Sequence, residues 1–185
     1  MAAAAAGLAL DPERPNALSL AALAAFRGVK RRQEVRLAAA RTTVIEDFGH
    51  HPTALAETLQ SLRARFPGAL LTAVFEARSN TARTKAMQSG FMRALAQADE
   101  VYLGAVNRAE KIPAAERFDP EAVAQQLEAQ GVEAHFATTN PALLEKLTAN
   151  TLAPAGAAGG KPRVVVFFTN GSFDGIIDGY VAAAK

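Results

Sequence analysis

Short apolar runs alternate along the chain with stretches of mixed polarity. The runs with few polar interruptions predict strands at 33–37, 42–46, 70–75, 101–106, 132–136 and 164–168. Elsewhere apolar residues recur every three or four positions, as Leu55, Leu59 and Leu62 do, and this period predicts helices. The predicted helices are 16–26, one starting at Pro52 before the strand at 70, one before the strand at 101, and two more near 120–130 and 141–150.

This order of elements predicts an α/β fold. A strand that is apolar at every position has both faces covered, whereas a strand with one wet face would alternate polar and apolar residues. The sequence therefore predicts a Rossmann-like, mainly parallel sheet flanked by helices on both sides. A chain of 185 residues is long enough for one such domain with a sizeable core, and no internal repeat is evident.

Composition narrows the class of protein. Half of the residues are hydrophobic, yet no apolar run approaches the roughly 20 residues that cross a bilayer, so we expect no membrane partner. The first residues lack the basic start of a secretory signal. The absence of cysteine excludes thiolate metal sites and suits a reducing, cytoplasmic compartment. The net charge of +2 is smaller than nucleic-acid binders usually carry.

The run Asp47-Phe48-Gly49-His50-His51-Pro52 stands where a predicted strand gives way to a helix. Gly49 permits a turn, and Pro52 suits the first turn of a helix. In open α/β sheets ligands bind at the carboxyl ends of strands, where the next helix offers free N–H groups. Two interpretations stay open: a ligand site, or a proline-started helix with exposed histidines.

Two other predicted strands end in polar segments, Glu76 to Thr81 and Thr169 to Gly175. Parallel strands would bring both segments to the same edge of the sheet as Asp47. Arg78 offers a planar fork of donors suited to a carboxylate or phosphate, and Ser79, Asn80 and Thr81 can orient a polar ligand or cap a helix. Ser172 has the same two possible roles at the last helix.

Two further runs, one basic and one rich in glycine, have the composition of phosphate-binding segments. Lys30-Arg31-Arg32 is a solvated turn, a nucleic-acid contact, or a place from which one arginine reaches a nucleotide phosphate. Gly159-Gly160-Lys161 is not a phosphate loop, because Pro162 stands where Ser or Thr is needed and a strand follows instead of a helix.

Four segments in this order resemble the C-terminal domain of the Mur ligases, the ATP-dependent amide-forming enzymes of bacterial peptidoglycan synthesis. They read FRGVKRRQE, DFGHHPT, FEARSNT and TNGSFDG, within a resemblance that covers about residues 16–185. The order looks most like the branch that joins UDP-N-acetylmuramate to the murein tripeptide L-alanyl-γ-D-glutamyl-meso-diaminopimelate in cell-wall recycling. His-His-Pro is shared with the ligase that adds L-alanine. Ala77, Ser172 and Asp174 depart from the tripeptide branch, which has proline and glycines there.

The resemblance implies a three-domain enzyme of which this chain carries the last domain. Residues 1–27 would be a remnant of the central ATPase domain with its linker helix, and 28–185 the C-terminal ligase domain. Since no phosphate loop is present, we expect the ATPase core to be missing and the chain to be inactive alone. ATP and Mg²⁺ would be bound mainly by the absent domains. The implied partners are those domains, UDP-N-acetylmuramate and the tripeptide.

The resemblance also assigns residues. Such ligases activate a carboxylate as an acyl phosphate, which an amine then attacks, so positioning and charge neutralisation matter more than a dedicated acid or base. No catalytic residue and no metal ligand is therefore assigned. The same ligase adding L-alanine is the alternative, and a nucleic-acid-binding module is a distant one. The expected ATP-binding residues are Arg32, Asp47, His50 and His51, and the expected substrate-binding residues are Arg78, Ser79, Asn80, Thr81, Gly171 and Ser172.

Overall fold

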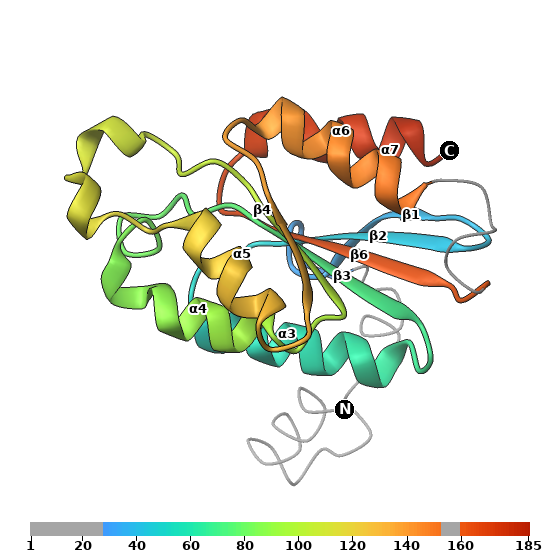
Figure 1. Ribbon diagram of the computed structural model, residues 1–185. Helices are drawn as coiled ribbons and strands as arrows, with labels where there is room; N and C mark the ends of the chain where they lie inside the picture. The colour runs from blue at the N-terminus through green and yellow to red at the C-terminus, as the bar shows by residue number, and fades with distance from the viewer. Residues whose placement is uncertain (1–27, 153–159) are drawn as a thin grey trace, which may run out of the picture.

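The computed structural model describes residues 28–152 and 160–185. Its centre is one six-stranded sheet with the order β1-β2-β6-β3-β4-β5 (Figure 1). Only β1 is antiparallel to its neighbour, and the other pairings are parallel. The mainly parallel sheet is therefore confirmed, with an antiparallel edge strand added. The strands are β1 Glu34–Ala38, β2 Thr42–Asp47, β3 Leu70–Phe75, β4 Glu100–Leu103, β5 Glu133–Phe136 and β6 Arg163–Phe168.

Helices cover both faces of the sheet. In Figure 1, α3 (Pro52–Arg65), α4 (Gln88–Leu95) and α5 (Pro120–Glu128) lie below it, and α6 (Asn140–Thr151) and α7 (Ile176–Ala183) lie above. The buried apolar residues accordingly form two clusters, one on each face. Because successive side chains of a strand point to opposite faces, β6 contributes Val166 to the lower cluster and Val165 to the upper one.

Proline and short polar side chains set where these helices begin. A proline occupies the first turn of α3, α5 and α6, where a missing N–H costs nothing. Asp119 caps α5 by accepting from the backbone N–H of Ala122, and Thr139 caps α6 through Ala142. Short 3₁₀ turns supply the remaining helical segments, and they are η2 Lys85–Met87, η3 Ala109–Lys111, η4 Ala114–Glu116 and η5 Phe173–Gly175.

The structure corrects some predicted boundaries. The strand predicted over 101–106 ends at Leu103, because the backbone N–H of Ala105 donates to the Asn140 side chain (3.0 Å) instead of continuing the ladder. The helix predicted to reach residue 130 ends at Glu128. The chain from Gly104 to Asp119 instead forms an outlying lobe with η3 and η4, at the left in Figure 1. The predicted helix 16–26 lies outside the described residues.

Membrane insertion is not indicated by the helices. In the two described ranges, none combines the length and apolar character needed to cross a bilayer.

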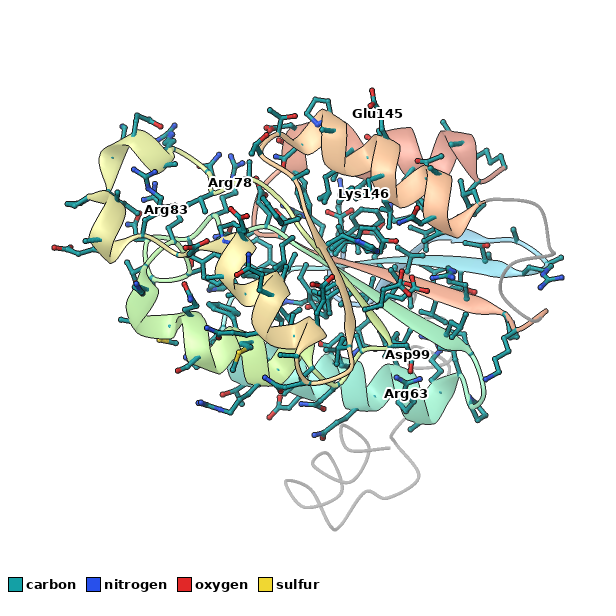
Figure 2. All side chains as sticks on the ribbon, viewed as in Figure 1. Arg63, Arg78, Arg83, Asp99, Glu145 and Lys146 are labelled. Carbon is teal, nitrogen blue, oxygen red and sulfur yellow. The ribbon has the colours of Figure 1, made fainter. Side chains whose placement is uncertain are left out.

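An ion pair fastens the amino-terminal edge of the sheet. The Asp99 carboxylate accepts from Arg63 Nη1 (2.8 Å) and from the backbone N–H of Leu71 (2.7 Å). Figure 2 shows Arg63 and Asp99 facing each other at the end of the molecule opposite the lobe. Burial by itself would raise the pKa of Asp99, but these two hydrogen bonds and the charge of Arg63 outweigh it and lower the pKa.

We expect Asp99→Asn to lower the free energy of unfolding at neutral pH, and the difference from wild type to shrink in acid. A carboxyl whose pKa is lower when folded stabilises the fold above its unfolded pKa of about 3.9 and stops doing so as the pH falls through the folded value. Urea unfolding from pH 7 to pH 3 measures this. A difference that stays constant over that range would contradict the assignment. Glu128→Gln, on the exposed end of α5, is the control.

Candidate functional site

The carboxyl ends of β2, β6 and β3 meet at Thr169, the residue that follows β6. Its backbone N–H donates to the Asp47 carbonyl (3.1 Å), and the N–H of Glu76 donates to the Phe168 carbonyl (3.1 Å). The Thr169 hydroxyl donates to the buried Glu76 carboxylate. The polar segments that follow these three strands therefore lie side by side, as the sequence predicted.

Arg31 connects the segment before β1 to this meeting point. Its Nε donates to Glu46 Oε1 (2.7 Å), and its Nη2 donates to the carbonyls of Thr169 (3.2 Å) and Gly171. Glu46 is 4% exposed and also pairs with Arg36, so its charge is matched on two sides. Through its Nε and Nη2 atoms, Arg31 is thus a structural tie between residues far apart in sequence.

Asp47 organises the loops on either side of β2. Oδ2 accepts from the backbone N–H of Gln33 (3.0 Å), and Oδ1 accepts from that of Gly49 (2.7 Å). A Cβ on Gly49 would approach Oδ1 to 2.8 Å, which is closer than real Cβ atoms come, so a glycine is needed there. Asp47 is only 4% exposed, and the first role of its carboxylate is to hold this crossover.

The two histidines are exposed at the start of α3. His51 is the N-cap of the helix, and its Nδ1 accepts from the backbone N–H of Thr53 over a long 3.4 Å. His50 Nδ1 lies 3.0 Å from the Phe48 carbonyl, and its ring packs edge-on against Phe48. Both histidines are therefore exposed at the start of a helix that begins with proline, which agrees with either interpretation from sequence.

Arg32 is exposed and lies over the Phe48 ring, with its guanidinium carbon 5.5 Å from the ring centroid. It borders a depression of about 320 Å³ together with Gln33, Asp47 and residues of α3. The structure thus brings Arg32 and Asp47 to one surface hollow, whereas the histidines do not line it. An arginine held by an aromatic face keeps its donors free for phosphate oxygens.

Arg78 lies against the turn that follows β6. A Cβ on Gly171 would overlap the Nε, Cδ and Cζ atoms of Arg78, so the two segments fit only because residue 171 has no side chain. Arg78 Nη1 also lies 3.4 Å from Glu76 Oε1. Burial raises the pKa of Glu76, while the Thr169 hydrogen bond and the Arg78 charge oppose that rise. Glu76 therefore anchors Arg78 from below and leaves its outer donors accessible.

Ser79, Asn80 and Thr81 make local contacts in the loop after Arg78. Ser79 Oγ accepts from the backbone N–H of Ala82 (3.1 Å), and Asn80 Oδ1 accepts from Arg83 Nη2 (2.7 Å). The Thr81 carbonyl accepts from the Thr84 hydroxyl (2.8 Å). These contacts explain the shape of the loop, and Asn80 and Thr81 remain exposed beside Arg78.

Ser172 does not cap the last helix, because Gly175 occupies the N-cap position of α7. Ser172 is exposed and lines a second depression of about 640 Å³ together with Gly171, Lys30 and Arg31. Of its two roles considered from sequence, ligand contact is the one that the geometry leaves open.

Sequence reasoning missed the groups that support this site. Glu46, Glu76 and Thr169 are buried, and Arg31 ties Glu46 and the Thr169 carbonyl to the segment before β1. The signal was present, because carboxylates at the ends of apolar strands must be paired when they are buried. Their partners could not be read from sequence, since Arg31 and Thr169 are 138 positions apart.

The described residues offer no metal site of their own. Within 28–152 and 160–185, no three His, Asp or Glu side chains converge as ligands would. The carboxylates nearest the site, Glu46, Asp47 and Glu76, are already hydrogen-bonded to protein donors. This donor set does not fit Mg²⁺, whereas the exposed guanidinium of Arg32 can donate to a phosphate oxygen.

Comparison with known proteins identifies the family. Residues 31–168 match the model described as "Mur ligase, glutamate ligase domain". The UDP-N-acetylmuramate–L-alanine ligase of Roseiflexus is 39% identical over 106 residues, which are 57% of this chain and 21% of that protein. The UDP-N-acetylmuramate–L-alanyl-γ-D-glutamyl-meso-2,6-diaminoheptandioate ligase of Escherichia coli is 43% identical over 83 residues, 44% of this chain and 18% of that protein.

Solved structures show the same fold. The UDP-N-acetylmuramate-alanine ligase of Thermotoga maritima has a TM-score of 0.67 at 23% identity, over 97% of this chain and 36% of that one. The MurF ligase of the same organism, solved with ADP, has a TM-score of 0.60 at 17% identity, over 96% and 36%. The chain belongs to the Mur ligase family and carries its C-terminal domain. Its matches span about a fifth of the length of these curated relatives.

We expect Gly171→Ala to displace Arg78. The added methyl group would occupy space now filled by the flexible, partly exposed arginine side chain, so that side chain would shift, at a loss of stability smaller than the ~1–3 kcal/mol of core overpacking. Thermal unfolding measures the loss, and NMR shifts of the Arg78 Nε–H measure the displacement. Gly68→Ala is unsuitable as a control because of its positive φ, so Ser61→Ala on the exposed face of α3 serves. An unmoved Arg78 signal would refute the packing argument.

Proposed function

We propose that this chain is the C-terminal domain of an ATP-dependent ligase that joins UDP-N-acetylmuramate to the tripeptide L-alanyl-γ-D-glutamyl-meso-diaminopimelate in peptidoglycan recycling. The observation that carries the proposal is the position of Arg78. Its guanidinium is held between Glu76 and Gly171 at the carboxyl edge of the sheet, with a 30% exposed side chain. An anchored planar cation at this edge suits a carboxylate of a peptide, because it offers two parallel hydrogen bonds.

The nucleotide would lie on the β2 side of Arg78. Arg32 would contact ATP phosphates, and Asp47, His50 and His51 would border the nucleotide or the sugar substrate from the α3 N-terminus. Arg32 and Asp47 already share one hollow. The other half of the ATP site, with Mg²⁺, would come from a central domain, of which residues 1–27 are a remnant, while 28–185 form the closing domain. The domain alone would show no ligase activity, and the intact enzyme would work in the cytoplasm.

Transfer of L-alanine to UDP-N-acetylmuramate is the alternative. Several similar relatives carry that activity in their names, and the His50-His51-Pro52 segment serves both proposals. The nucleic-acid module has less support, since Arg31, one of its three basic residues, is engaged with Glu46 and two backbone carbonyls. The segment Arg78-Ser79-Asn80-Thr81 supports the tripeptide, because it resembles the tripeptide branch.

We expect the intact ligase to consume ATP with the tripeptide as acceptor, and Arg78→Lys to lower kcat/KM for the tripeptide about 10- to 100-fold. The lysine keeps the charge but loses the bidentate geometry. Release of phosphate with UDP-N-acetylmuramate and either tripeptide or L-alanine is the assay. Arg93→Lys, exposed on α4, is the matched control and should behave as wild type. Turnover with L-alanine and none with tripeptide would establish the alternative instead.

A further inference from the structure

A cavity of about 360 Å³ opens at the carboxyl ends of β4 and β5, away from every residue assigned above. The outlying lobe from Gly104 to Asp119 forms one wall, and the start of α5 and the end of β5 form the other. Neither the ATP-binding residues nor the Arg78 loop lines it. Its charged and apolar lining includes Val106, Arg117, Phe118, Asp119, Glu121 and Phe136.

The lobe is bonded directly to the Arg78 loop. The backbone N–H of Asn107 donates to the Ala77 carbonyl (3.1 Å), and that of Phe118 donates to the Arg83 carbonyl (2.8 Å). Arg83 Nη1 donates back to the Asn107 carbonyl (3.1 Å). Figure 2 shows Arg78 and Arg83 on the side of the molecule that carries the lobe. The lobe that forms one wall of the cavity is therefore hydrogen-bonded to the loop that carries Arg78.

The cavity is lined by side chains of both charges and by apolar side chains. Arg117 donates through Nη2 to the Ile112 carbonyl (2.7 Å), while its buried Nε has no hydrogen-bond partner among the described residues. Glu121 is exposed in the first turn of α5, at the opposite wall. Phe118, only 2% exposed, and Val106 add apolar surface to the lining. A ligand that matches this lining has a carboxylate, an ammonium group and a short methylene chain.

We propose that this cavity binds the far amino-acid group of the tripeptide's diaminopimelate residue, with Arg117 on its carboxylate and Glu121 on its ammonium. This inference rests on the proposed function and adds a specificity site to it. A diaminoheptandioate carries a second α-amino-acid group at the end of its side chain, and that group has the charges that the cavity complements. L-Alanine has no such extension and would leave the cavity unfilled.

The distances along the sheet edge agree with the length of the peptide. In the order β2-β6-β3-β4-β5, the nucleotide side is at β2, Arg78 follows β3, and the cavity follows β4 and β5. Neighbouring strands lie about 4.8 Å apart, so the cavity is about 5–10 Å beyond Arg78. One extended residue spans about 3.5 Å, and the γ-linkage and the diaminopimelate side chain lengthen this. A glutamyl carboxylate at Arg78 therefore places the last residue at the cavity.

The test compares two peptides on the intact ligase. Glu121→Gln removes the proposed ammonium contact, and Ala114→Phe fills the cavity from an exposed lobe position. We expect either change to raise KM for the tripeptide at least about tenfold and to leave KM for the dipeptide L-alanyl-γ-D-glutamate unchanged. Glu128→Gln, on the same helix but outside the cavity, should change neither value.

A second measurement guards against misfolding of a variant. In the folded 185-residue chain, the tripeptide should shift the NMR signals of Val106 and Thr138 as well as those of the Arg78 loop, and the dipeptide should shift only the latter. Tripeptide turnover that both variants leave unchanged, or that they lower equally for the two peptides, overturns the cavity assignment and leaves the proposed function standing. Absence of turnover with either peptide overturns both.

Discussion

The structure depends on the parallel pairing of β6 between β2 and β3. All six residues of β6 are buried, and its register aligns Phe168 with both Asp47 and Phe75. The three strands therefore end level, and Thr169 closes the join through the Asp47 carbonyl and the Glu76 carboxylate. The candidate residues that follow β2, β3 and β6 are brought together because these strand ends meet. A shift of one residue in that register would turn each buried side chain to the opposite face and move the three strand ends out of line.

Buried charge is concentrated where the strand ends meet. Glu46 is matched by Arg31 and Arg36, and Glu76 by Thr169 and Arg78. Removing one partner of a buried pair typically costs about 3–5 kcal/mol, because the other charge is left without compensation. Here the pairs also hold the segment before β1 against the turn after β6. The same contacts that satisfy the buried carboxylates thus set the position of the segment before β1.

The edge of the sheet is divided into regions with different chemistry. The β2 end carries Arg32 and the exposed histidines, the β3 end carries Arg78, and the β4 and β5 ends carry the mixed-charge cavity beneath the lobe. Strand order places these regions in a line, so an extended substrate can use them in sequence. The lobe begins where β4 ends, at Leu103. Beyond that point the Asn140 side chain accepts from the backbone N–H of Ala105, and its Nδ2 donates to Asp174 Oδ2 (2.7 Å).

The sequence by itself determined the class of fold and the segments that carry the site. Uninterrupted apolar strands predicted the buried parallel sheet, and glycine, proline and polar residues marked the strand ends at Asp47, Arg78 and Gly171. Tertiary structure alone decided what each side chain does there. Asp47 holds the crossover after β2, His51 caps the start of α3, and Arg31 pairs with the buried Glu46. The cavity had no signal in the sequence, because it lies between residues 105–121 and residues 136–138, which only folding brings together.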